Sequence, residues 1–166
     1  MSPPASDLAA LIQQLEQQES DLVFDGFDHA AAWRLGSALV ARATQESAPV
    51  AVDIRLGEQQ VFHAALAGSF ADNDAWIERK CALVRRFGVS SFLFGRRLAA
   101  AGKSLEEATL LDPAHFAAHG GAFPILIDGV GVVGTVAVSG LPQSEDHRMV
   151  VEVLTEFLAT ASPDRS

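Results

Sequence analysis

Cysteine and long hydrophobic runs are almost absent from this chain. The 166 residues include one cysteine, Cys81, which excludes an intrachain disulfide, and its helical spacing from Ile77 and Val84 favours a place in the core over a reactive thiol. The longest apolar run, 130–138, is interrupted by two glycines and a threonine and is far shorter than the roughly 20 residues that cross a bilayer. The first residues have neither the basic start nor the apolar stretch of a secretory signal. We therefore expect a cytoplasmic protein with no membrane partner.

Basic residues are also scarce. Twelve Lys and Arg stand against 21 Asp and Glu, and the resulting net charge of −9 argues against a nucleic-acid partner. The basic residues are nevertheless clustered, because seven of the twelve lie within 25 positions: Arg79, Lys80, Arg85, Arg86, Arg96, Arg97 and Lys103. Two interpretations stay open. The cluster is either a pair of solvated helix faces or a local positive patch for a small molecule that carries carboxylates.

Signatures of catalysis and of metal binding are missing as well. No spacing matches a metal-ligand set, a catalytic triad or a phosphate-binding loop. His115 and His119 are four residues apart, but the stretch around them is too short for a confident helix and has no matching carboxylate. Ser139 with His147 lacks a nucleophile elbow and a third member. We predict no metal site, and the sequence leaves open whether the protein is an enzyme.

The chain reads as one domain, 7–160, between a disordered tail at 1–6 and a flexible tail at 161–166. Hydrophobic periodicity and turn residues predict five strands, most of them joined by hairpins, and enough helices to cover both faces of a sheet. The predicted class is α+β, in three α/β/α layers with a five-stranded, mostly antiparallel sheet. The predicted strands begin with 21–24 and 50–56, continue with a strand from Gln59, and end with 122–127 and 130–138.

A two-residue turn at Gly57 and Glu58 predicts the first hairpin. The predicted pairs are Leu56 with Gln59, Ile54 with Val61 and Val52 with His63. This register places Asp53, Arg55, Gln60 and Phe62 on the opposite face, as a polar cluster above one aromatic ring. The cluster is either a ligand contact or a salt bridge that covers the sheet.

The segment 119–147 carries most of the functional information. It holds a second hairpin, predicted to turn at Asp128 and Gly129, and the start of the last helix. Glycines stand at both outer ends of this hairpin, in Gly120-Gly121 and Ser139-Gly140, where a backbone without Cβ atoms can approach a ligand or a neighbouring subunit. His119 lies at the same sheet edge. These positions predict the location of a site but not its reaction.

Six short motifs stand out along the chain: LVFDGFD, AVDIRL, FHAAL, DNDAWIERK, GGAFPI and GVGVVGTVAVSGLPQSEDH. The last two resemble motifs of the haem-degrading-domain superfamily, also called GlcG-like or HbpS-like, and the first four are similar to its cytosolic branch. The resemblance implies a profilin-like three-layer domain, symmetric homo-oligomers built from dimers, and a relation to proteins that bind or slowly degrade haem or bind other small ligands. The cofactor stays unknown, with haem as one candidate and another acidic planar molecule as an alternative. The candidate ligand-binding residues in these motifs are Asp53, Arg55, His63, Asn73, Asp74, Trp76, Arg79, Lys80, His119, Gly120, Gly121, Ser139, Gly140 and His147.

We therefore predict an oligomeric protein with a pocket for an acidic small molecule near the hairpin ends, bordered by the Asp53 and Arg55 face and by the helix that carries Trp76. The roles expected are charge neutralisation by Arg79 or Lys80, stacking by Trp76 or Phe123, and coordination or hydrogen bonding by His119.

Two alternatives stay open. In the first, the protein is an enzyme in which His119 or His147 acts as a general base with Asp53 as its partner. In the second, the motif residues form subunit or partner contacts and the protein has no ligand pocket.

Overall fold

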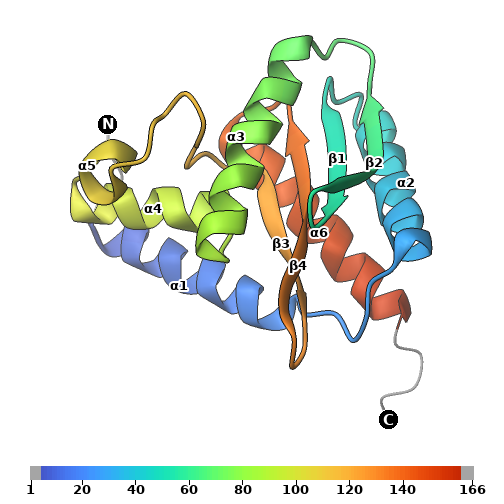
Figure 1. The fold of residues 1–166 in the computed structure, drawn as a ribbon, viewed down its shortest axis with the longest axis horizontal. Helices are drawn as coiled ribbons and strands as arrows, with labels where there is room; N and C mark the ends of the chain where they lie inside the picture. The colour runs from blue at the N-terminus through green and yellow to red at the C-terminus, as the bar shows by residue number, and fades with distance from the viewer. Residues whose placement is uncertain (1–4, 162–166) are drawn as a thin grey trace.

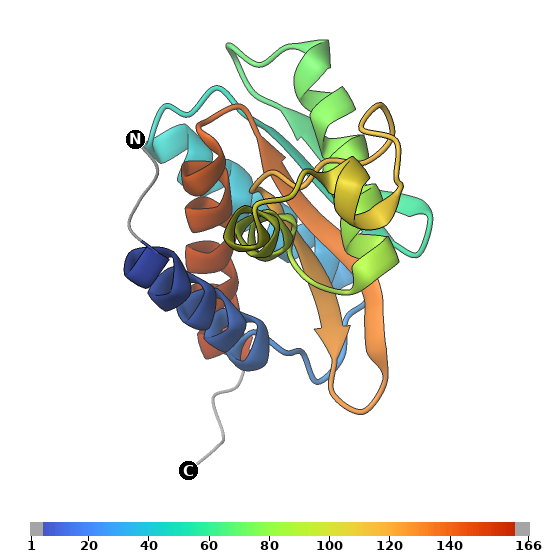
Figure 2. The same cartoon turned by 90° about the vertical axis from the view of Figure 1, so that its left-hand side faces the viewer.

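Four antiparallel strands form one sheet with helices on both of its faces (Figures 1 and 2). The computed structural model describes residues 5–161. Of the tails predicted at 1–6 and 161–166, residues 1–4 and 162–166 lie outside this range, whereas residues 5, 6 and 161 belong to helices. The strand order is β2-β1-β4-β3, with α2 and α6 on one face and α3 on the other. In chain order the elements are α1 (Ala5–Asp21), α2 (His29–Gln45), β1 (Ala51–Leu56), β2 (Gln59–Ala65), α3 (Ala71–Phe87), α4 (Ser91–Ala101), α5 (Leu105–Thr109), β3 (Ala122–Ile127), β4 (Gly131–Ser139) and α6 (Gln143–Ala161).

The prediction of a fifth strand at 21–24 is wrong. Helix α1 continues to Asp21, and only Phe24 pairs with the sheet, through an isolated parallel bridge to Ile127. The Phe24 ring is buried against Phe27 and Phe157, with ring centroids 5.1 and 6.2 Å away. The Phe24 side chain therefore anchors the connection between α1 and α2 to the core. The predicted α+β class with an antiparallel sheet is confirmed.

The first hairpin has the predicted turn but not the predicted register. Leu56 does pair with Gln59, whereas an irregularity between Ile54 and Arg55 shifts every later pair by one residue. Asp53 consequently pairs with His63, and Ile54 with Phe62. The shift turns Phe62 toward α2, where its ring lies 5.6 Å from that of Trp33, and His63 replaces it beside the polar cluster.

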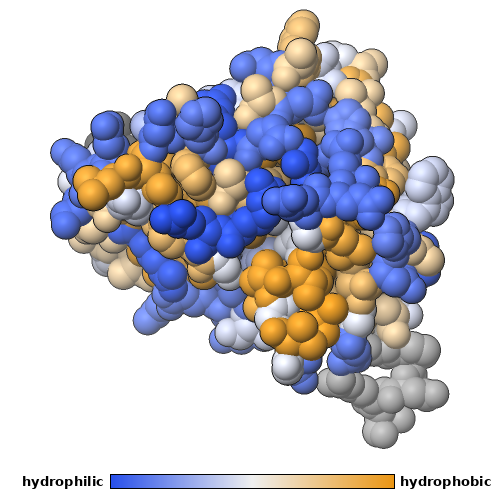
Figure 3. All heavy atoms as spheres, viewed as in Figure 1, coloured by the Kyte–Doolittle hydropathy of each residue, from blue (hydrophilic) through white to orange (hydrophobic). Residues whose placement is uncertain are grey.

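The second hairpin turns through three residues rather than two. β4 begins at Gly131, which pairs with Ile127, so the strand predicted from Val130 begins one residue later. Val130 lies at the tip with 72% of its surface exposed, and Phe87 and Val132 are exposed hydrophobic residues too. A hydrophobic patch covers this end of the hairpin (Figure 3).

The two faces of the sheet have different cores. Large aliphatic and aromatic side chains fill the space beneath α2 and α6, among them Leu35, Leu39 and Ile54. A cluster of smaller side chains, including Ala137 and Cys81, lies beneath α3 and lets the helix approach β4 closely. Cys81 is in the core as predicted, and burial raises its thiol pKa to about 11.

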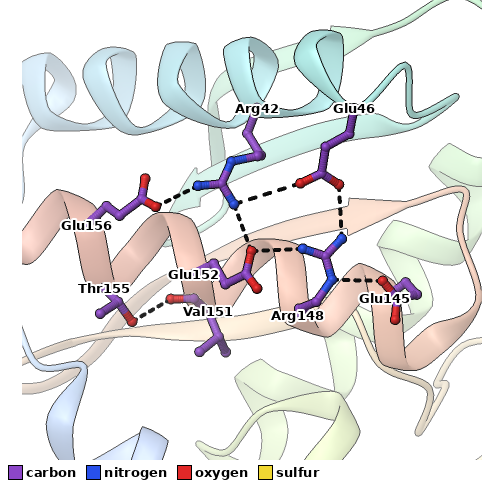
Figure 4. A network of polar contacts seen from close by, with 8 residues as sticks. All are labelled: Arg42, Glu46, Glu145, Arg148, Val151, Glu152, Thr155 and Glu156. Atoms are coloured by element: carbon purple, nitrogen blue, oxygen red, sulfur yellow. Dashed lines mark hydrogen bonds and ion pairs between the residues drawn. The ribbon is translucent and has the colours of Figure 1, made fainter.

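An ion-pair network fixes α2 against α6 on the face away from α3 (Figure 4). Arg42 contacts Glu152 and Glu156 at 2.7 and 2.6 Å, and Arg148 contacts Glu46 and Glu152 at 2.9 and 2.8 Å. Because each arginine contacts more than one carboxylate, the network fixes the position of α2 relative to α6 more firmly than a single surface ion pair would.

The helix ends follow local capping rules. The Asp28 carboxylate accepts a hydrogen bond from the Ala31 amide at the start of α2, and Gly88 ends α3 with φ 72°. Helix α3 begins at Ala71, so Asn73 lies inside its first turn, and the Asn73 side chain accepts from the Phe70 amide at 2.8 Å. Within residues 5–161, no helix has the length and apolar character needed to cross a membrane.

Candidate functional site

A cleft of about 230 Å³ lies between the first half of α3 and the glycine-rich ends of the second hairpin. We call it the glycine cleft. Helix α3 forms one wall, the segment before β3 forms a second, and the connection from β4 to α6 forms the third. The lining residues are Asn73, Trp76, Lys80, His119, Gly120, Ser139, Gly140, Leu141, Gln143 and Asp146. The structure thus brings together His119, Ser139 and the Trp76 helix, which are far apart in the sequence.

Glycine is required at the cleft because the protein's own backbone closes in there. A Cβ atom on Gly120 would lie 2.1 Å from the Gln143 carbonyl oxygen, and one on Gly140 would lie 2.3 Å from that of Pro49. Gly121 adopts φ 125°, which side chains rarely allow, and a Cβ there would meet Lys80 Nζ at 2.6 Å. The sequence predicted that a ligand or a neighbouring subunit approaches these glycines closely. In the structure, other segments of the same chain approach them.

Lys80 ties these segments together from beneath the cleft. Its residue surface is only 2% exposed, and its ammonium group donates to the carbonyl oxygens of Gly120 and Val138 at 2.9 and 3.0 Å. A third contact, 3.4 Å long, reaches Asp146 Oδ2. Burial lowers the pKa of Lys80, and the neighbouring Asp146 carboxylate opposes that change. Because its donors already have partners, Lys80 holds the cleft's walls in place.

Asp146 is a site residue that the sequence patterns did not single out. Its carboxylate accepts from the Leu141 amide at 2.9 Å and lies 3.4 Å from the Gly140 amide, so it occupies the anion position that this glycine-rich turn offers. Burial raises the pKa of Asp146 to about 6, although Lys80 acts in the opposite direction. An acid six residues after Gly140, in the first turn of a helix, is the signal that could have identified it.

His119 stands at the mouth of the cleft beside an aromatic and a cationic side chain. Its ring centroid lies 5.0 Å from that of Trp76 in an edge-on contact, and the Arg79 guanidinium lies 4.0 Å above the Trp76 ring. Burial lowers the pKa of His119, and the charges of Lys80, Arg79 and Arg96 lower it further. The imidazole is therefore neutral at pH 7. Within residues 5–161 neither of its ring nitrogens has a hydrogen-bond partner, so an electron pair is available to a ligand.

A second depression, of about 420 Å³, begins on the other side of Trp76 and His119. We call it the outer hollow. It lies between α3, α4 and the loop before β3, and it shares Trp76, His119 and Gln143 with the glycine cleft. The Gln143 side chain accepts from the Gly120 amide at 3.1 Å and so fixes the boundary between the two spaces. The principal polar and small residues of the hollow are Arg79, Arg96, Lys103, Ser104 and Gly95.

The Asp53 and Arg55 face forms a separate polar hollow of about 210 Å³, which α3 lines with Asp74, Ile77 and Glu78 and not with the residues that face the glycine cleft. Asp53 is buried and accepts from Arg55 Nε at 3.0 Å, while His63 Nε2 lies 2.8 Å from Asp74 Oδ1. Arg55 also contacts Glu78. These contacts between neighbouring side chains are what the salt-bridge interpretation expects, and they do not border the glycine cleft.

Phe123 and His147 lie in the protein interior, away from the glycine cleft. Phe123 belongs to the core beneath α2 and α6. The His147 ring packs 4.9 Å from that of Phe92, its Nε2 lies 2.8 Å from the Gln18 side-chain oxygen, and burial alone lowers its pKa to about 4. Among the described residues, no three His, Cys, Asp or Glu side chains are placed to hold a metal ion.

The fold and the glycine cleft together define a small α+β protein with a polar, glycine-walled depression at one end of its sheet. Residues 27–155 match the family model described as haem degrading protein HbpS-like, and the chain belongs to that family. A protein named UPF0303 protein from Streptomyces avermitilis is 57% identical over 147 residues, which cover 89% of this chain and 90% of the relative.

Two solved structures show the same fold. The crystal structure of Ybr137w protein superposes with a TM-score of 0.83 and 32% identity, over 90% of this chain and 88% of that one. The crystal structure of a PduOC:Heme complex superposes with a TM-score of 0.65 and 17% identity, over 78% of this chain and 94% of that one. At that identity the second likeness concerns the fold alone.

Proposed function

We propose that the protein binds an acidic small molecule in the glycine cleft, with haem as the first candidate and His119 as the group that contacts it. The observation that carries the proposal is the place of the His119 ring at the mouth of the cleft, beside Trp76 and the Arg79 guanidinium and without a hydrogen-bond partner in residues 5–161. Membership of the HbpS-like family, and a structural neighbour named as a haem complex, support the choice of ligand.

The residues present fit such a molecule in two respects. A neutral imidazole nitrogen is a ligand that haem iron accepts, and the Arg79 guanidinium beside it offers charge to a carboxylate. The glycine cleft alone is smaller than the roughly 300 to 1,000 Å³ of usual ligand pockets, so a porphyrin would extend beyond it past His119. When bound, haem would supply a redox-active iron.

A haemin titration followed by the Soret band tests the proposal. We expect a saturable, shifted Soret band in the wild-type protein and an at least roughly tenfold weaker or spectrally different complex in His119→Ala, because iron loses its nitrogen ligand. His115→Ala is the matched control, since this exposed histidine stands four residues away and lines neither space. Identical spectra for wild type and His119→Ala would show that His119 does not contact the bound haem.

We also propose that the protein associates with itself, as a homo-oligomer built from dimers, and that it acts in the cytoplasm. The exposed hydrophobic patch of Phe87, Val130 and Val132 supports self-association, because contiguous apolar surface is uncommon on monomers. Native mass spectrometry counts the subunits, and a monomer at micromolar concentration would refute the proposed assembly.

A further inference from the structure

The outer hollow differs from the rest of the molecule in its charge. The chain has a net charge of −9, yet the charged side chains that line this space are all cationic: Arg79, Arg96 and Lys103. They come from different places, α3, α4 and the loop after α4, so they converge on the hollow through the fold rather than through sequence proximity. No Asp or Glu is among its lining residues.

These three cations also lack carboxylate partners within residues 5–161. Five of the eight other Lys and Arg side chains within residues 5–161 form ion pairs, among them Arg97 with Glu16 and Arg55 with Asp53. Arg79 instead donates to the Ala75 carbonyl of its own helix and stacks on Trp76. Uncompensated positive charges held close together repel one another, which makes an anion at this place favourable.

Arg96 adds a specific unsatisfied donor. Its Nε atom is buried and has no hydrogen-bond partner, while its guanidinium carbon lies 5.2 Å from the centre of the Phe92 ring. Leaving a buried donor unpaired is unfavourable, so such groups are uncommon in folded proteins. The guanidinium is held by packing against Phe92, and its remaining donors can serve an oxyanion.

The backbone around the hollow is built to hold its shape. A Cβ on Gly95 would lie 2.2 Å from the Ala118 carbonyl oxygen, so glycine alone lets α4 approach this loop. The Ala117 amide donates to the Arg79 carbonyl at 3.0 Å and fixes the same loop to α3. The nearby acid Glu107 is engaged at the start of α5, where it accepts from the Ser104 amide.

From these observations we infer that the outer hollow is a binding site for a multiply charged oxyanion, which Arg79, Arg96 and Lys103 recognise. The anion is either a phosphate ester or a group of carboxylates on a small molecule, because guanidinium and ammonium groups bind both. The ligand's remaining part would lie against Trp76 at the boundary with the glycine cleft. The site does not require iron or His119.

Tryptophan fluorescence provides a direct measurement. The chain has two tryptophans, and Trp33 is 66% exposed on the opposite face of the sheet. The Trp33→Phe protein therefore reports from Trp76 alone. We expect pyrophosphate, citrate or both to change its emission saturably at constant ionic strength, while sodium chloride does not. Saturation by pyrophosphate alone assigns phosphate esters, saturation by citrate alone assigns carboxylates, and saturation by both assigns the general oxyanion site.

Charge-removing variants decide whether the cations are responsible. We expect Arg96→Gln and Lys103→Gln, each in the Trp33→Phe background, to raise the half-saturating concentration of the active probe about tenfold. Arg86→Gln is the matched control, because Arg86 is an exposed cation of α3 that does not line the hollow, and we expect less than about a twofold change. Lys103 is exposed, so its variant keeps the test valid if Arg96→Gln folds poorly.

Two results would overturn the inference: no saturable change with either probe, or an equal loss in Arg86→Gln. The haemin titration separates this inference from the proposed function. If haemin binding fails and pyrophosphate or citrate still binds through Arg96 and Lys103, the inference holds and the haem proposal fails. If haemin binds through His119 and neither pyrophosphate nor citrate binds, the haem proposal holds and the inference fails.

Discussion

His147 shows how burial alone sets the chemistry of one side chain. It stands in the SEDH motif, which made it a candidate for ligand binding or for general-base catalysis, but the fold places its ring in the interior beside Phe92 and lowers its pKa to about 4. An imidazole that stays neutral down to this pH cannot take up a proton in the folded state under ordinary conditions. A stability measurement follows from this.

The first prediction concerns acid stability. The unfolded chain protonates His147 near pH 6.5 and the folded chain only near pH 4, so this group lowers the free energy of unfolding as pH falls between those values, by up to about 3 kcal/mol. Asp146, with its pKa raised to about 6, acts in the opposite direction across an overlapping range. We expect His147→Gln to lack the destabilisation that His147 causes as pH falls and to keep the opposite effect of Asp146.

Urea unfolding at about pH 7 and about pH 4.5 measures the difference. The wild-type protein should lose more stability between these two values than His147→Gln does, by about 1–3 kcal/mol. His115→Gln controls for removal of an exposed histidine and should follow the wild type. Parallel pH dependence in all three proteins would mean that the His147 pKa is not lowered by folding.

The candidate residues fall into three groups that the sequence could not separate. His119 and Ser139, candidates because glycines flank the hairpin ends, and Trp76, a candidate through its motif, line the same cleft. The sequence could not show that Lys80 is committed to backbone carbonyls, because those contacts join α3 to segments 40 and 58 positions later in the chain. Nor could it show that α3 separates the Asp53 cluster from this cleft.

At the scale of elements, glycines decide how closely helices and loops approach. Most helix bounds could be predicted from capping residues and hydrophobic periodicity, both of which are local. The isolated bridge that replaces the predicted strand at 21–24, and the register of the first hairpin, could not be predicted, because strand pairing and the bulge near Ile54 depend on the rest of the sheet. Local patterns set the elements, and tertiary packing sets their pairing.

The packing of α4 against the loop before β3 gives a second prediction. Gly95→Ala would place a Cβ 2.2 Å from the Ala118 carbonyl oxygen, and neither backbone can move freely. We expect a loss of about 1–3 kcal/mol in the free energy of unfolding, together with weaker oxyanion binding in the adjoining outer hollow. Gly26→Ala is the control, because a Cβ at that position would meet nothing within 4 Å and its φ is ordinary. Equal stability of the two variants would show that α4 can shift without cost.

At the scale of the whole molecule, charge and apolar surface are divided among different regions. The α2 and α6 face carries a closed ion-pair network, while the junction of α3 and α4 gathers cations that lack such partners within residues 5–161. The hydrophobic patch covers the tip of the second hairpin (Figure 3). The glycine cleft and the outer hollow thus lie at the junction of α3 and α4, where the local positive charge attracts anions although the whole chain is acidic.

The most direct test of the central claim is to locate a bound porphyrin. Gallium protoporphyrin, a diamagnetic substitute for haemin, allows nitrogen-proton correlation spectra of the labelled protein to be recorded during a titration. We predict saturable shifts of the Trp76 indole signal and of the Gly120 and Gly140 amides, with the Trp33 indole unchanged. Shifts at Trp33 or at the second hairpin's tip, with the Trp76 signal unmoved, would contradict the account.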